Sequence, residues 1–181
     1  KQKQKVPIDT SFTANTKTIA APISVSVLIR SALSGEKLTG TSARNILADI
    51  YRSLVLDHAN AYKLFFDSLS DPNNFPLTFY CVAGKDRTGL AAALLLTALG
   101  ASRDTIYDDY LLTNTCWEIP TDVLREESDE VREAVFTADT HYLDAAFATM
   151  SEHYGSAEIF VRTILGLNPE RREYLLAQLV E

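Results

Sequence analysis

The sequence predicts an α/β fold in which helices predominate around a small, mostly parallel sheet. A short apolar and aromatic run, Leu77 to Val82, lies between Pro76 and Gly84 and has the length and composition of a buried strand. A very apolar helix is predicted soon after it, from about Thr88 to Leu99, and amphipathic helices are predicted before and after this unit. We therefore place the strand at the centre of the sheet, with helices covering both faces.

The bulk composition is that of one globular domain. A chain of 181 residues, 46% apolar and 23% charged, is long enough for one core and short for two, so we expect a single domain over 1–181. The formal charge of -7 argues against a nucleic-acid partner and requires any phosphate site to be a local feature. No run is apolar enough for a membrane span, so we expect no transmembrane segment.

The part of the chain before the predicted strand is partly helical. Residues 1–40 show weak periodicity, with short β-branched runs at Ile19 to Ile23 and Val25 to Ile29. From Thr41 to Ser70 apolar residues recur at spacings of three and four, which predicts one long or two consecutive amphipathic helices ending before Asp71-Pro72.

The part after the strand is predicted to be helical throughout. The apolar helix stops at Gly100, and Ser102 caps the next one, which runs to about Thr115. After Pro120 the acidic stretch Arg125 to Glu133 is predicted on a helix that resumes toward His153 and stops at Gly155. Ser156 is expected to cap a short helix ending at Gly166, and Asn168-Pro169 opens the last one. The acidic stretch is interpreted as a solvated helix face, with a mobile lid as the alternative.

The loop between the strand and the apolar helix carries the chemistry. It places Cys81 and Arg87 six positions apart, ahead of a helix N-terminus. A tight loop of this length can turn its N–H groups inward as an anion cradle, supplemented by the helix dipole. These donors and the guanidinium favour thiolate over thiol at Cys81, which makes it a nucleophile near neutral pH. Arg87 can bind two phosphate oxygens at once, which a lysine cannot.

The other loop residues have supporting roles in this hypothesis. Asp86 is the leading candidate for the general acid that protonates the leaving oxygen. The Thr88 hydroxyl is expected to point at the Cys81 sulfur and help it leave when water attacks a phosphocysteine. One role for Lys85 is to offset Asp86 and balance the charge of the loop. The predicted phosphate-binding residues are Val82, Ala83, Gly84, Lys85, Thr88 and Gly89.

The segment CVAGKDRTG resembles the C-x5-R-[ST] signature of tyrosine and dual-specificity phosphatases, and is most similar to the bacterial and fungal PtpB-like group. The stretches DTIYDDYLLTN, YGS and LGLNPERREYLLAQL also resemble that group. The resemblance implies a protein tyrosine phosphatase-like fold and hydrolysis of phosphotyrosine, of phosphoserine or phosphothreonine, or of phosphoinositides. The reaction would pass through a phosphocysteine without metal or cofactor. Lys85 resembles the extra cation of phosphoinositide phosphatases, which implies an alternative role for it, contact with a second phosphate on an inositol ring.

The sequence departs from this pattern in two places. Tyr80 stands where such loops usually have histidine before the cysteine, so we expect retuned activity. The arginine-containing DLR motif of the strand-rich first part of the family is not found before Cys81. We therefore expect the chain to lack part of that region, which could also hold the general acid.

Other functions fit the sequence less well than the phosphatase does. Tyr80 motivates the main alternative, a pseudophosphatase that binds phosphorylated partners without turnover. A rhodanese-like or arsenate-reducing loop usually lacks the Arg-Thr-Gly ending, and the three histidines show no ligand spacing for a metal site or a Cys-His protease. Cys116 is interpreted as a filler residue of the core or of the surface, without a catalytic role. Two reduced cysteines favour the cytoplasm, although a removed export signal would leave no trace.

Overall fold

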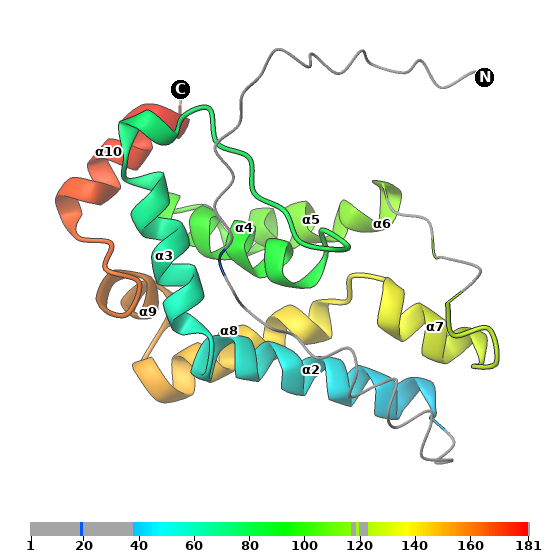
Figure 1. The fold of residues 1–181 in the computed structure, drawn as a ribbon. Helices are drawn as coiled ribbons and strands as arrows, with labels where there is room; N and C mark the ends of the chain where they lie inside the picture. The colour runs from blue at the N-terminus through cyan, green and yellow to red at the C-terminus, as the bar shows by residue number, and fades with distance from the viewer. Residues whose placement is uncertain (1–18, 20–37, 117–118, 120–122, 181) are drawn as a thin grey trace, which may run out of the picture.

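The structure is a computed structural model of residues 1–181, and it describes residues 19, 38–116, 119 and 123–180. Figure 1 shows the arrangement of the helices, which form the bulk of the described chain. In order they are α2 (Gly40–Leu56), α3 (Ala59–Leu69), the 3-10 helix η1 (Pro72–Asn74), α4 (Asp86–Leu99), α5 (Arg103–Leu111), α6 (Thr113–Cys116), α7 (Asp129–Phe136), α8 (Thr140–Tyr154), α9 (Ala157–Thr163) and α10 (Pro169–Leu179). The β-branched runs predicted before residue 30 lie, apart from residue 19, outside the described residues.

Residues 41–70 form two helices, which confirms the second of the two predicted arrangements. A capping box starts α2: the hydroxyl of Thr39 accepts a hydrogen bond from the N–H of Ser42, and the Ser42 hydroxyl accepts one from the N–H of Thr39. Asp57 caps the end of α2, and α3 begins directly after His58. One face of α3 is buried, and it includes Tyr62, Phe65, Phe66 and Leu69.

The segment at residues 75–82, where the sequence predicts a buried strand, is not assigned as one. Its partly buried residues alternate with exposed ones, which is typical of an extended chain with one covered face. Tyr80 is 79% exposed and Val82 is 92% exposed, so the prediction of a strand buried on both faces is wrong here. A strand needs a paired neighbour, and no segment in the described part of the chain pairs with this one. The small parallel sheet therefore stays a prediction.

The apolar helix after the loop is α4, and it lies in the interior as predicted. Most of its circumference is buried, and it packs against α5, α9 and α10. It ends at Gly100, whose φ of 87° lies in the left-handed region that glycine adopts without strain. Ser102 then caps α5 by accepting a hydrogen bond from the N–H of Thr105.

The helix predicted to carry the acidic stretch and continue to His153 is interrupted. The structure has α7 and α8 instead, separated by residues 137–139. Asn114 binds both backbone groups of Ala138 through its side-chain amide, with N···O distances of 2.7 and 2.8 Å, and Asp139 caps α8. These contacts hold the backbone outside a helix. Most side chains from residue 125 to 133 are exposed, as predicted for a solvated stretch, but residues 125–128 lie outside the helix, which begins only at Asp129.

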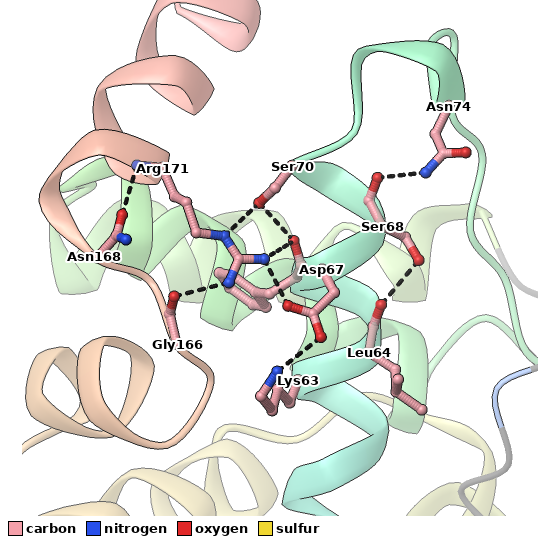
Figure 2. A network of polar contacts seen from close by, with 10 residues as sticks. Lys63, Leu64, Asp67, Ser68, Ser70, Asn74, Gly166, Asn168 and Arg171 are labelled. Atoms are coloured by element: carbon pink, nitrogen blue, oxygen red, sulfur yellow. Dashed lines mark hydrogen bonds and ion pairs between the residues drawn. The ribbon is translucent and has the colours of Figure 1, made fainter.

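The last two helices start where the sequence predicts. Ser156 caps α9, and Asn168 caps α10 with a proline in its first turn. Figure 2 shows how Arg171 of α10 joins the ends of other elements. Its guanidinium donates to the Gly166 carbonyl at 2.9 Å, to the Phe66 carbonyl at 3.2 Å and to the Asp67 carboxylate at 2.7 Å. Burial raises the pKa of Asp67, but hydrogen bonds from Lys63 and Arg171 outweigh it and lower the pKa overall.

The buried apolar residues of these helices form one cluster. Helices α2 and α8 pack along each other, and α2 also contacts α7, as Figure 1 shows. Among the described residues, none of the helices has the length and apolar character needed to cross a membrane. That the chain forms one domain stays a prediction. The fold places the start of α4, and the loop before it, beside α3, α2 and the turn between α7 and α8.

Candidate active site

The loop from Cys81 to Lys85 joins the extended segment to the first turn of α4. Gly84 makes the turn with a φ of 69°, a conformation that strains other residues. A Cβ added at Gly84 would meet no neighbouring heavy atom within 4 Å, so the backbone angle and not space requires glycine here. The first N–H groups of α4 have no acceptor within the helix, and the positive end of its dipole lies here. The elements of an anion cradle are thus brought together.

Cys81 is half-buried, and its surroundings stabilise the thiolate. Burial raises the pKa of the thiol. Hydrogen bonds from the Thr88 hydroxyl, from the N–H of Thr88 and from the N–H of Gly84, together with the charge of Arg87, outweigh that effect and lower the pKa overall. The structure therefore directs the Thr88 hydroxyl at the Cys81 sulfur, as the sequence predicts.

Lys85 is buried, with 2% of its surface exposed, and its ammonium group is engaged inside the protein. It donates to the carbonyl of Val135 at 2.7 Å and to that of Thr137 at 3.2 Å, at the end of α7. It also forms an ion pair of 3.2 Å with Asp86 and lies over the Tyr142 ring at 5.4 Å from the centroid. The structure thus favours Lys85 as the partner of Asp86, and corrects its assignment as a side chain that binds phosphate.

Asp86, in the first turn of α4, belongs to a buried hydrogen-bond network. Its Oδ1 accepts a hydrogen bond from the Tyr51 hydroxyl at 3.1 Å and faces Lys85. The Tyr51 hydroxyl is in turn 2.8 Å from that of Tyr110. Since both contacts use Oδ1, a proton given to a leaving group would have to reside on Oδ2. Asp86 can thus brace the loop, donate a proton, or do both.

The remaining residues of the predicted site are Val82 and Ala83 in the loop and Arg87 in the first turn of α4. Arg87 is partly buried, and its charge acts on Cys81 and on Tyr62 of α3. Val82 is 92% exposed and Ala83 is partly buried. Neither apolar side chain can hold an anion, so both can serve a phosphate only through their backbone N–H groups.

Gly89 has a different role from the predicted one. Its N–H donates to the carbonyl of Lys85 at 2.9 Å inside α4, so it is not available to a phosphate. A Cβ at this position would lie 2.9 Å from the Tyr110 ring. Gly89 therefore permits the close packing of α4 on α5, and its assignment as a phosphate-binding residue is corrected.

Three aromatic residues near the loop are missed by sequence reasoning. Tyr51, Tyr62 and Tyr110 occupy buried positions on amphipathic helices, where the pattern indicates only core packing. The one available signal is that each is tyrosine where phenylalanine would fill the same space, since a buried hydroxyl usually serves a hydrogen bond. Tyr80, by contrast, is exposed, and Cys116 is exposed at the end of α6, which is the surface position of the two positions predicted for it.

Comparisons with known proteins agree on one family. The model of the tyrosine phosphatase family matches residues 2–181. A Cupriavidus necator protein, named as a candidate tyrosine-protein phosphatase, is 29% identical over 170 residues, which cover 90% of this chain and 62% of that protein. The triple specificity protein phosphatase PtpB of Mycobacterium tuberculosis is 33% identical over 104 residues, which cover 48% of this chain and 38% of PtpB. The chain spans less than two thirds of either relative.

Proposed function

Because this chain belongs to the tyrosine phosphatase family, we propose that it hydrolyses phosphate monoesters through a phosphocysteine formed on Cys81. The family assignment confirms the resemblance inferred from CVAGKDRTG. The observation that carries the proposal is the set of donors converging on Cys81, which comprises the Thr88 hydroxyl, two backbone N–H groups and the charge of Arg87. Such a set activates a thiol as a nucleophile.

The proposed reaction has two steps. The Cys81 thiolate attacks phosphorus in line, the bond from phosphorus to the ester oxygen breaks, and the leaving oxygen takes a proton from a general acid. Water then attacks the phosphocysteine, releasing inorganic phosphate and the thiolate, which the Thr88 hydroxyl stabilises. Arg87 and the N–H groups at the start of α4 stabilise the charge on the transferring oxygens in both steps.

The proposed substrates are phosphotyrosine first, with phosphoserine, phosphothreonine and phosphoinositides as further members of the class. PtpB is named for triple specificity, which supports a broad substrate range. The buried side chain of Lys85 removes the specific reason to favour a lipid, because its ammonium group is already bound to two carbonyls and Asp86. We therefore rank phosphoprotein above phosphoinositide.

The test is hydrolysis by the full-length protein of an aryl phosphate, of phosphotyrosine and phosphoserine peptides, and of phosphoinositides in vesicles. We expect vanadate-sensitive turnover of the aryl phosphate and of the phosphotyrosine peptide. Tight binding of phosphopeptides without turnover of any substrate would favour the pseudophosphatase. Turnover confined to phosphoinositides would reverse the ranking and leave the phosphatase standing.

The variant Asp86→Asn is expected to show whether Asp86 protonates the leaving oxygen or only holds the loop in place through its hydrogen bond and ion pair. If Asp86 donates the proton, we expect this variant to slow hydrolysis of phosphotyrosine by about 10²-fold or more, and of esters with strongly acidic leaving groups by less than about 10-fold. The basic limb of the pH–rate profile should flatten as well.

The matched control is Tyr51→Phe, which removes one hydrogen bond to Asp86 and leaves its carboxyl in place. We expect this variant to slow good and poor leaving groups by the same factor. Equal losses for both kinds of ester in Asp86→Asn would assign Asp86 to bracing alone, and would require another general acid.

A further inference from the structure

Tyr62 of α3 lies close to the Cys81 loop, within electrostatic reach of Cys81, Asp86 and Arg87. In Figure 1 the chain rises through α3, turns at η1 and descends through residues 75–85 to α4. The rings of Phe65 on α3 and Phe79 on the descending segment are 4.7 Å apart between centroids, which fixes how the two run past each other. Tyr62 lies one helical turn before Phe65 on α3. Cys81 lies two residues after Phe79 on the extended segment, on the same face of that segment. Because α3 and the extended segment run in opposite directions, the contact of Phe65 with Phe79 places Tyr62 beside Cys81.

The hydroxyl of Tyr62 is buried and has no hydrogen-bond partner among the described residues. Only 4% of the residue is exposed. A buried unpaired hydroxyl costs stability, and phenylalanine would fill the same space without that cost. Burial raises the pKa of Tyr62 far above its usual range, and the other groups that act on it are Cys81 and Asp86, which raise it, and Arg87, which lowers it. The phenol therefore stays protonated, and it is a potential donor within electrostatic reach of Cys81.

We propose that Tyr62 is a positioning residue whose hydroxyl donates a hydrogen bond to the Sγ of Cys81 when the thiolate forms. This inference rests on the proposed use of Cys81 as the nucleophile. The hydrogen-bond donors already on Cys81, from Gly84 and Thr88, and the charge of Arg87 all come from the loop and the first turn of α4. Tyr62 would add one from α3. Hydrogen bonds at catalytic groups are often long in the empty site and shorten when it is occupied.

The experiment measures the thiolate directly and does not depend on turnover. In a Cys116→Ser background Cys81 is the sole thiol of this chain, and its alkylation by iodoacetamide can be followed as a function of pH. Removing a hydrogen bond to the thiolate with Tyr62→Phe should raise the midpoint of alkylation by about one pH unit. The acidic limb of the pH profile of kcat/KM should move by the same amount.

The matched control is Tyr174→Phe. The hydroxyl of Tyr174 on α10 is also buried without a partner among the described residues, and Tyr174 is not one of the groups that act on Cys81. We expect this variant to leave the midpoint unchanged, and neither variant should unfold at lower urea than the parent. If the pH midpoint of Cys81 alkylation is below that of an ordinary thiol in the parent and Tyr62→Phe leaves it unchanged, the role of Tyr62 is overturned and the proposed nucleophile stands. An ordinary thiol midpoint in the parent would overturn both this role and the proposed nucleophile.

Discussion

Cys81→Ser is expected to abolish turnover while leaving oxyanion binding largely intact. The serine hydroxyl fills the same place, but it is a far weaker nucleophile than a thiolate, so we expect kcat to fall by roughly 10⁴-fold or more. The groups proposed to bind the phosphate do not change in this variant, because they are the N–H groups of the loop and α4 and the guanidinium of Arg87. The measurements are single-turnover hydrolysis of an aryl phosphate and binding of vanadate or a phosphotyrosine peptide by calorimetry.

The matched control for this variant is Cys116→Ser. Cys116 is the second thiol of the chain, and it lies exposed at the end of α6, outside the loop. We expect it to keep the parent rate within about twofold, as is usual for a substitution away from the reacting groups. Near-normal turnover in Cys81→Ser, together with an inactive Cys116→Ser, would show that the nucleophile is the other cysteine. Loss of both turnover and oxyanion binding in Cys81→Ser would indicate that the loop depends on the thiolate for its shape.

The helices were predictable because their signals are local. Ser102, Ser156 and Asn168 each bond to an N–H a few residues ahead, and Gly100 and Gly155 have positive φ angles where helices end. These effects depend on neighbours in the chain, which the sequence displays. The gap between α7 and α8 has one local signal, the cap by Asp139, but the hold on Ala138 was not predictable, because it comes from Asn114, 24 residues away.

In the candidate site, too, the features set by residues close in sequence were predictable, and those set by distant residues were not. The spacing of Cys81, Arg87 and Thr88 places them in one loop and the first turn of the helix that follows it, and so their relation could be predicted. The direction of Lys85 could not, since it is determined by the carbonyls at the end of α7, 50 and 52 residues further along. An ammonium group at a helix C-terminus is stabilised by the dipole as well as by the hydrogen bonds. The function of Gly89 is likewise determined by Tyr110, a residue on another helix.

The buried pair of Lys85 and Asp86 explains how an acidic chain keeps a site for anions. The formal charge is -7, and Asp86 adds a carboxylate in the loop itself. Because Lys85 forms an ion pair with Asp86 at 3.2 Å, this negative charge is offset at short range. Arg87 and the start of α4 then supply the positive potential at Cys81. In the proposed phosphate site Lys85 would therefore act by compensating Asp86, because its ammonium group is already bound inside the protein.

Arg87→Lys is expected to lower kcat strongly although it keeps the charge. Arg87 is the second residue of α4, next to Thr88, and its charge acts on both Cys81 and Tyr62. A planar guanidinium donates two parallel hydrogen bonds to the oxygens of a phosphoryl group, whereas an ammonium acts as a point charge on a flexible stem. We expect kcat to fall by about 10²- to 10³-fold, because the lost donor acts on charge that develops in the transition state.

The kinetic signature of Arg87→Lys distinguishes this reason from a loss of general electrostatics. If only attraction were lost, KM would rise and kcat would hold, and raising the salt concentration would reduce the difference between variant and parent. Loss of the bidentate contact predicts a lower kcat at every salt concentration and weaker vanadate binding, because vanadate resembles the transferring group. The control is Arg52→Lys on α2, where the arginine is exposed and paired with Asp49, and for which we expect parent kinetics. Unchanged kcat in Arg87→Lys would remove Arg87 from the phosphate site and leave Cys81 dependent on the N–H groups of the loop and α4.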